Sequence, residues 1–283
     1  MAEMNSDRRM HPDELTGVLD PVNLARYDAR WIAPAPDVDV VVDQYWTVNW
    51  NLPRDEFIDQ AVIDLPAVSL SIEEGDVPAP LVITGLLRRA WSRRIEGAGR
   101  VFAARLKPAG LAVLSSLKPV DLADQTLPVT PEVDPGLHQL MQRIRRERSV
   151  EARARAADAL IREQLARNPP PDSHLLANGI LTELRSLEYH RASSPLTRRF
   201  GVSERTIQRA MSATLGIGPK QALRRIRLQE AAQAFVLDGE DQLTEIAIRL
   251  GFTDQAHLTK EFRDATGVTP GAYRRSVRAL LDL

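Results

Sequence analysis

The stretch "GFTDQAHLTKEFRDATGVTPGAYRR", residues 251–275, decides how the carboxyl-terminal part of this chain folds. A glycine and a short polar turn precede a segment whose apolar residues recur every three or four positions: Leu258, Phe262 and Ala265. This spacing predicts a helix with one buried face. Gly251 suits the left-handed backbone that ends the preceding helix, whose apolar stripe runs from Leu243 to Leu250. The stretch therefore predicts a helix, a tight turn and a second helix that Asp254 caps.

The same pattern occurs once more, in "LTRRFGVSERTIQRAMSATLGIGP", residues 196–219. Gly201 matches Gly251 at an offset of 50 residues, and the matches that follow fall at an offset of 51. They are Ile207 with Leu258, Met211 with Phe262, Gly216 with Gly267, and Pro219 with Pro270. One supersecondary unit is therefore used twice, with one extra residue in the second turn. Residues 220–237, between the copies, contain neither Pro nor Gly and predict one uninterrupted helix.

Two helix–turn–helix units point to DNA as the partner. The second helix of such a unit has an apolar back and a polar front, and the front enters the major groove. The two polar fronts are Glu204, Arg205, Gln208 and Arg209 in the first unit, and Gln255, Ala256, His257 and Lys260 in the second. Arg and Gln pair with guanine and adenine edges, whereas Lys and Ser suit phosphates. Residues 173–283 also carry 16 Lys and Arg against 12 Asp and Glu, which is typical of a region that binds a polyanion.

Both copies resemble the AraC/XylS family of transcriptional regulators, over about residues 175–278. In the second copy the shared features are Gly251-Phe252, the pair Leu258 and Phe262, Gly267-x-x-Pro270 and Tyr273-Arg274. In the first copy they are Ser203, Gln208-Arg209, Gly216 and Pro219. The resemblance implies two helix–turn–helix units on a long helix, reading two successive major-groove segments. It assigns contact with double-stranded DNA to Ser203, Arg205, Gln208, Arg209, Gln255, Ala256, His257 and Lys260.

The amino-terminal half has a different pattern. Residues 1–37 are rich in Pro and Asp and predict a loose arm. From Asp39 to Lys107, short apolar runs are broken by Pro and Gly, which is typical of a domain of strands and turns. The segments 136–148 and 150–167 carry apolar stripes at helical spacing and predict a helical hairpin. The family resemblance implies the same order, a barrel-like effector domain followed by dimerising helices.

The prolines of "NPPPD", residues 168–172, mark the boundary between the halves, because consecutive prolines stop helices and stiffen linkers. The predicted fold class is α+β: a mostly-β, barrel-like domain with a helical hairpin, then an all-α domain. The predicted organisation is an amino-terminal arm (1–38), a sensor and dimerisation domain (39–168), a linker (169–174) and a DNA-binding domain (175–283).

The composition argues against an enzyme. The chain has no cysteine, which removes disulfides, thiolate metal sites and the nucleophile of a DNA-repair methyltransferase. Only His11 and His138 precede residue 173, too few for a cupin-type metal site. No Ser/His/Asp set is discernible. We therefore expect no catalytic activity, no metal site and no cofactor.

We expect a cytoplasmic transcriptional activator or repressor. The chain has no apolar run of about 18 residues and no secretory signal at its start, so no contact with a membrane is predicted. Candidate partners besides DNA are RNA polymerase, an unidentified small-molecule effector and a second copy of the chain.

Several alternatives remain open at the level of the sequence. The helical third could bind another protein without reading DNA, and the strand domain could hydrolyse or modify a small molecule. Trp46 and Trp50 share a strand face, either in the core or in a ligand cage. "RRAWSRR" (88–94) predicts a strand with one charged side, which an anionic effector could use. The apolar stripe of 136–148 could be a core face or a dimer seam.

Overall fold

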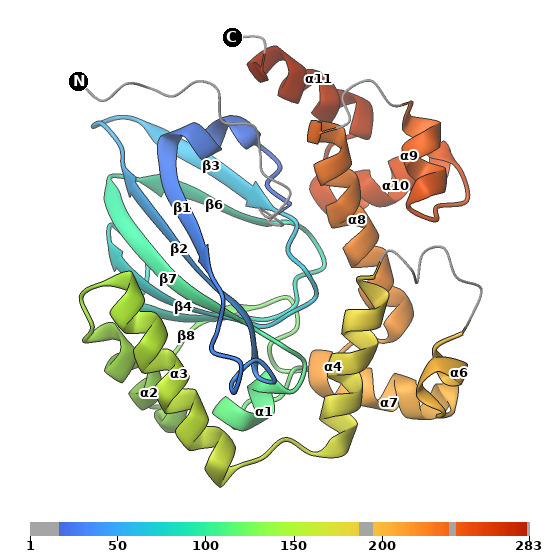
Figure 1. The fold of residues 1–283 in the computed structure, drawn as a ribbon. Coiled ribbons are helices and arrows are strands. Elements are labelled where there is room, and N and C mark those ends of the chain that lie inside the picture. Colours follow the sequence, from blue (N-terminus) through green and yellow to red (C-terminus); the bar gives the residue numbers. More distant parts are fainter. Residues whose placement is uncertain (1–16, 187–194, 238–241, 282–283) are drawn as a thin grey trace.

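The computed structural model describes residues 17–186, 195–237 and 242–281 (Figure 1). A β-rich half, blue to green in the figure, lies beside a helical half, yellow to red, which confirms the α+β class. The β-rich half begins with a short 3-10 helix, η1 (Pro21–Arg26). Its strands are β1 (Tyr27–Ile32), β2 (Val42–Asn51), β3 (Phe57–Val62), β4 (Ser69–Gly75), β5 (Leu81–Thr84), β6 (Trp91–Glu96), β7 (Ala98–Leu106) and β8 (Thr126–Pro128).

The strands form two antiparallel sheets. Six of them make one sheet in the order β1-β2-β7-β4-β5-β8, and β3 pairs with β6 in a separate two-stranded sheet. Inward side chains of both sheets line a single cavity, so the two-stranded β3–β6 sheet lies opposite one face of the six-stranded sheet.

Strand β1 lies where the sequence predicted an arm. Tyr27, Ala29 and Trp31 point into the cavity while Asp28 and Arg30 face outward, so the segment alternates as a half-buried strand does. The strand has only six residues and its neighbours are rich in Pro and Asp, so its alternation is too short to be recognised in the sequence. The expectation of a loose arm is therefore wrong for residues 21–32, and residues 1–16 lie outside the described part of the chain.

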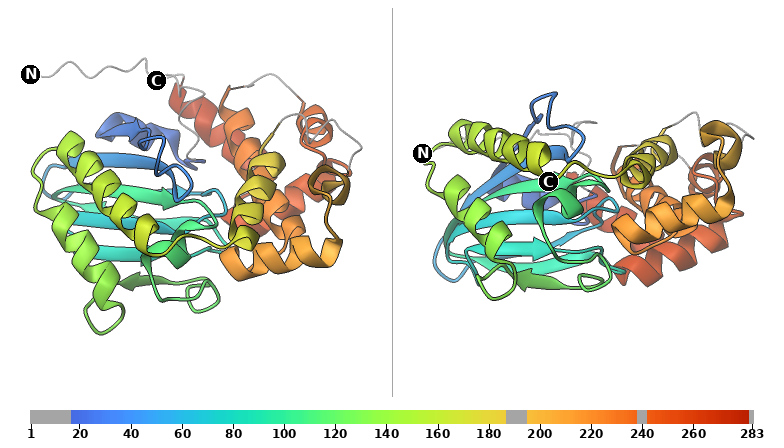
Figure 2. Two further views of the ribbon diagram at one scale, coloured as in Figure 1. Left: turned by 60° about the horizontal axis from the view of Figure 1, so that its bottom comes forward. Right: turned by 90° about the horizontal axis from the view of Figure 1, so that it is seen from below.

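A helical hairpin covers the other face of the six-stranded sheet (Figure 2). It consists of α2 (Pro135–Arg145) and α3 (Val150–Arg167), and follows the short helix α1 (Gly110–Leu114). Its predicted stripes are buried against the sheet: Leu137, Leu140, Met141, Ile144, Leu160 and Ile161. The apolar stripe of α2 is thus a core face, and the alternative that it forms a dimer seam is wrong.

Asp134 fixes the start of α2. Its side chain is 3% exposed and accepts hydrogen bonds from the Leu137 N–H at 2.9 Å, the Ser115 hydroxyl at 2.7 Å and the Ser116 N–H at 2.9 Å. One carboxylate therefore caps α2 and ties it to the chain that follows α1.

The helical half consists of α4, two helix–turn–helix units and a final helix. Its helices are α4 (Asp172–Leu184), α6 (Leu196–Phe200), α7 (Glu204–Leu215), α8 (Pro219–Leu237), α9 (Leu243–Arg249), α10 (Gln255–Thr266) and α11 (Pro270–Leu281). Helix α8 is the uninterrupted connector that the sequence predicted. No helix within the described ranges is long and apolar enough to cross a membrane.

Each helix–turn–helix unit has its own apolar core. The first-unit core joins α4, α6, α7 and the beginning of α8 through Ile180, Leu184, Leu196, Ile207, Met211 and Ile226. The second-unit core joins the rest of α8 to α9, α10 and α11 through Phe235, Ile246, Leu258, Phe262 and Tyr273. The connector helix is thus shared by both cores, which fixes one unit relative to the other.

Glu230 on α8 should make stability depend on pH. Burial raises the pKa of its carboxyl to about 7, against the pull of Arg227 and Arg185. A carboxyl whose pKa is higher in the folded state contributes to the stability of that state at pH values below its unfolded pKa, about 4.3. This contribution is lost as the pH rises through about 7. We expect Glu230→Gln to raise the free energy of unfolding by about 1–3 kcal/mol at pH 8 and by much less at pH 4.5.

Urea unfolding at both pH values measures this effect. Glu96→Gln, at an exposed glutamate of β6, is the control and should change neither value. An equal gain from Glu230→Gln at both pH values would contradict the assignment to ionisation.

Candidate nucleic-acid interface and ligand cavity

Both helix–turn–helix units turn at a glycine with left-handed backbone. The φ angle is +65° at Gly201 and +73° at Gly251, a region that other residues adopt only with strain. Ser203 and Asp254 then cap α7 and α10, each accepting a hydrogen bond from the backbone N–H three residues later, at 3.2 and 2.7 Å. The predicted turns and caps are confirmed.

The predicted apolar backs of the two recognition helices are buried. These residues are Ile207, Ala210 and Met211 on α7, and Leu258, Phe262 and Ala265 on α10. Because an amphipathic helix exposes the face opposite its buried stripe, the polar fronts point away from the cores. All eight predicted DNA contacts are exposed: Ser203, Arg205, Gln208, Arg209, Gln255, Ala256, His257 and Lys260.

Several of these side chains are held by local contacts. His257 accepts a hydrogen bond on Nδ1 from the Thr253 N–H at 3.3 Å, and its ring lies edge-on to Phe252 with 5.5 Å between centroids. Gln255 accepts from the Thr244 hydroxyl at 3.1 Å. These contacts orient the first turn of α10 on the turn before it. In α7, the Gln208 amide donates to the Ser212 hydroxyl at 3.1 Å.

The remaining charged residues of the fronts are free to meet another molecule. Within the described ranges, the side chains of Arg205, Arg209 and Lys260 make no hydrogen bond or ion pair. Guanidinium groups pair bidentately with guanine or phosphate, and an ammonium group meets phosphate as a point charge. Both fronts therefore present cations that nothing else in the described structure neutralises.

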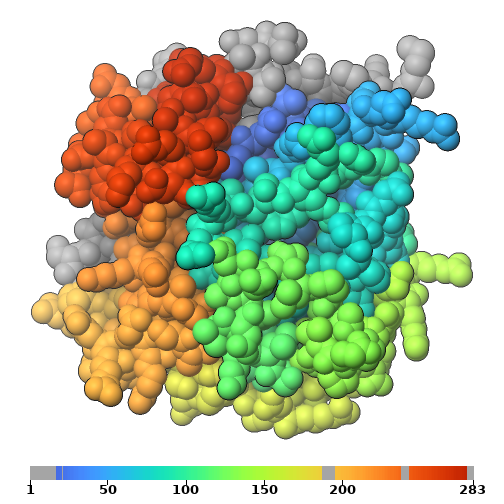
Figure 3. Space-filling view, turned by 180° about the vertical axis from the view of Figure 1, so that it is seen from behind, coloured from blue at the N-terminus to red at the C-terminus, as the bar shows by residue number. Residues whose placement is uncertain are grey.

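The recognition helices touch the β-rich half at their carboxyl-terminal ends. The carbonyl oxygen of Ala265, near the end of α10, accepts a hydrogen bond from the Ala90 N–H at 2.9 Å. At the end of α7, a Cβ on Gly216 would lie 3.6 Å from the carbonyl oxygen of Pro119. Figure 3 shows the two halves in broad contact. The contact leaves the amino-terminal turns of both helices, which carry the fronts, exposed.

Helices α8 and α11 add further contacts between the halves. Arg225 is buried and donates from Nε to the backbone oxygen of Asp64 at 2.9 Å, and its two Nη atoms lie 3.4 Å from the backbone oxygen of Arg89. The Tyr273 hydroxyl donates to the backbone oxygen of Val18 at 2.9 Å. The helical half is thus attached to residues that belong to, or adjoin, the cavity wall.

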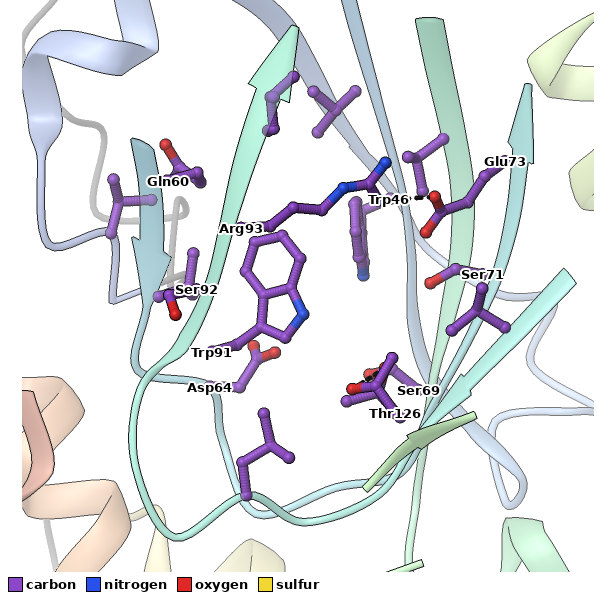
Figure 4. Close-up of a pocket in the computed structure, with 18 of the residues that line it drawn as sticks. Trp46, Gln60, Asp64, Ser69, Ser71, Glu73, Trp91, Ser92, Arg93 and Thr126 are labelled. Carbon is purple, nitrogen blue, oxygen red and sulfur yellow. Dashed lines mark hydrogen bonds and ion pairs between the residues drawn. The ribbon is translucent and has the colours of Figure 1, made fainter. Parts of the chain in front are cut away.

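The cavity between the two sheets has a volume of about 580 Å³, within the range of about 300–1,000 Å³ for small-molecule sites. Strand alternation builds its wall. On β4, Ser69, Ser71 and Glu73 face the cavity, whereas Leu70 and Ile72 face the helical hairpin. Figure 4 shows the inward side chains of β4 opposite those of β6.

All four tryptophans of the chain line this cavity: Trp31, Trp46, Trp50 and Trp91. Trp46 and Trp50 share a strand face, as predicted. Trp50 is buried and donates to the Glu96 backbone oxygen at 3.0 Å, whereas Trp46 is only half-buried. The pair thus belongs to both the core and the cavity wall.

The strand predicted in "RRAWSRR" is β6, with alternating sides. Arg93 points inward and pairs with Glu73 at 2.7 Å (Figure 4), and Arg94 points outward and pairs with Asp59 at 2.9 Å. Because Glu73 already neutralises Arg93, β6 alone does not form a binding site for an anionic effector.

Two family models match the chain. A helix-turn-helix domain matches residues 196–276, and a domain of unknown function (DUF6597) matches residues 30–128. The HTH-type transcriptional activator RhaS of Pectobacterium carotovorum subsp. carotovorum is 34% identical over 79 residues, 28% of each chain. A probable thc operon regulatory protein of Rhodococcus erythropolis is 35% identical over 98 residues, 32% of this chain and 29% of that one. The chain thus spans less than a third of the length of the curated relatives it matches. In overall shape it is similar to ToxT of Vibrio cholerae, at a TM-score of 0.44 and 8% identity, covering 89% of this chain and 98% of that one.

The two capped units and their exposed fronts define a DNA-binding protein of the double helix–turn–helix class. Over this helical half, the chain is similar to the AraC/XylS family of transcriptional regulators, as the resemblance indicated.

Proposed function

We propose that the chain regulates transcription by binding a specific DNA sequence in the cytoplasm, with α7 and α10 reading neighbouring major-groove segments about 10–10.5 bp apart. The exposure of both capped polar fronts, one on each unit, supports this most directly. Arg and Lys contacts with phosphates should make the affinity salt-dependent, and the front side chains should supply the specificity.

We also infer that the β-rich half controls DNA binding by taking a small-molecule effector in its cavity. The volume of the cavity and its aromatic wall support this proposal. So do the hydrogen bonds that join residues of the wall to α8 and α10. The division into a sensor domain, a linker and a DNA-binding domain remains a proposal too, as do RNA polymerase and a second copy of the chain as partners.

Selection of DNA from random oligonucleotides by the full chain tests sequence-specific binding. A single enriched motif with two elements one helical turn apart is the expected outcome. Retention of all sequences equally, or of none, would favour the alternative in which the helical half binds another protein.

Arg209→Ala should weaken binding to the selected site by about 1–3 kcal/mol and relax the preference at one base pair. The reason is that this exposed guanidinium has no partner within the described ranges. The measurement is a titration of the selected site and of its single-base variants. Arg148→Ala, at an exposed arginine just after α2, is the matched control and should leave binding unchanged. An equal loss from Arg209→Ala on selected and random DNA would show a phosphate contact instead.

A further inference from the structure

Asp64 lies at the point where the cavity meets both helix–turn–helix units. The residue before it, Ile63, is 0% exposed and packs in the second-unit core. The residue after it, Leu65, is 5% exposed and packs in the first-unit core. The backbone oxygen of Asp64 accepts from Arg225 on the connector helix, while its side chain lines the cavity. The segment Ile63–Leu65 therefore links the cavity wall to both cores.

The Asp64 carboxyl lacks a hydrogen-bond donor. It points into the cavity (Figure 4), and no side chain or N–H in the described ranges donates to it. Burial raises its pKa, against the attraction of Arg105 and Arg225. The carboxyl is half-buried in the cavity wall. A ligand that fills the cavity takes this acceptor away from water, so it gains affinity if it donates a hydrogen bond there.

The other inward charges are largely neutralised. Arg93 pairs with Glu73 at 2.7 Å, and Arg105 pairs with Asp43 at 2.7 Å. The third carboxylate of the wall, Asp124, pairs with Arg88 at 2.8 Å. Arg89 also borders the cavity, but its side chain is exposed to solvent. Among the charged side chains of the wall, Asp64 and the exposed Arg89 are thus the ones without an ion pair in the described ranges.

The aromatic wall favours the same kind of ligand. The faces of Trp rings attract cations, most strongly where water is excluded. Every tryptophan of the chain lines this cavity, and Trp91 pairs in register with Val62, two residues before Asp64. A carboxylate beside indole rings is a site for a positively charged nitrogen on an apolar body.

We propose that the cavity takes an organic cation, an amine on a flat apolar group that donates to Asp64, and that the segment Ile63–Leu65 transmits its binding to both helix–turn–helix units. The inference rests on the proposed function, because it names the ligand class and the route of control for that cavity. A cation at Asp64 competes with Arg105 and Arg225 for the same negative charge and shifts a residue whose neighbours are fixed in the two cores.

Tryptophan fluorescence of the full chain tests the ligand class without DNA, since all four tryptophans report on the cavity. The probes are 4-phenylbutylamine and its uncharged and acidic counterparts, 4-phenylbutanol and 4-phenylbutanoate. We expect saturable binding that is tightest for the amine, and about 10- to 100-fold weaker amine binding in Asp64→Asn.

Asp28→Asn is the matched control, at an exposed carboxylate on the outer side of β1, and should bind the amine as the unchanged chain does. Circular dichroism of each variant establishes that it is folded. No saturable amine binding, tighter binding of the acid through Arg89, or equal amine binding by folded Asp64→Asn would overturn the proposal.

Transmission is tested on the selected DNA site. The amine should change the DNA affinity of the unchanged chain by about 5- to 150-fold and that of Asp64→Asn by less than twofold. Amine binding without any change in DNA affinity would overturn the route through Ile63–Leu65. If the chain selects no DNA, the proposed function fails, and the fluorescence titration still decides the ligand class.

Discussion

Phe262→Ala is expected to destabilise the second helix–turn–helix unit by about 3–5 kcal/mol, the usual cost of truncating a fully buried aromatic ring. Phe262 is 0% exposed and contacts the rings of Phe235 on α8 and Tyr273 on α11, with centroid distances of 5.2 and 5.7 Å. Its loss opens a cavity where three helices meet, so α10 should lose its fixed position and the chain should no longer bind the selected DNA site.

Urea unfolding followed by circular dichroism gives the stability, and a gel shift gives the DNA binding. Val268→Ala is the control in the same unit, because Val268 is 42% exposed and its truncation should change stability by no more than about 0.5 kcal/mol. Wild-type stability in Phe262→Ala would contradict the packing described for the second-unit core.

Asp134→Ala is expected to cost about 2–4 kcal/mol, because it leaves the Leu137 and Ser116 N–H groups and the Ser115 hydroxyl without their acceptor. The site lies in the β-rich half, so stability should fall while the two polar fronts of α7 and α10 stay intact. Asp121→Ala, at an exposed aspartate, is the control and should be nearly neutral.

The same carboxyl predicts a pH dependence. Burial alone would raise the pKa of Asp134, but the hydrogen bonds from Leu137, Ser115 and Ser116 outweigh it and the pKa is lowered. A lowered pKa stabilises the folded state above the unfolded value, about 3.9, and this stabilisation is lost as pH falls through the folded pKa. Unfolding between pH 6 and pH 3 should therefore be steeper in the unchanged chain than in Asp134→Ala. Parallel curves would contradict this role.

The helical half could be predicted from the sequence because local rules determine it. The spacing of apolar residues predicted the buried face of α10, and the glycine and capping residues predicted the turn at Gly251 and the caps Ser203 and Asp254. Each depends on residues within about seven positions of one another, so the order along the chain is sufficient. Whether the exposed fronts contact DNA is a question about a second molecule, and it stays a prediction.

The cavity could not be predicted, because it is built by strands far apart in the sequence. Trp31 lies in a segment that was expected to be an arm, and Trp91 lies between two pairs of arginines. Nothing in the spacing brings them together with Trp46. Likewise, the alternation around Asp64 predicts that Ile63 and Leu65 face one way and Asp64 the other. It does not show that Ile63 and Leu65 fill the cores of two different units.

Those two side chains bear on any attempt to transfer the helical half to another protein. A chimera cut at the prolines near residue 170 would leave behind Ile63 and Leu65, which complete the two helical cores. The transferred helical half would have a cavity in each core and newly exposed apolar surface. A small residue in each core would have to be replaced by a larger one to fill that cavity. Any β-rich half that replaces this one would have to supply two apolar side chains at the positions of Ile63 and Leu65.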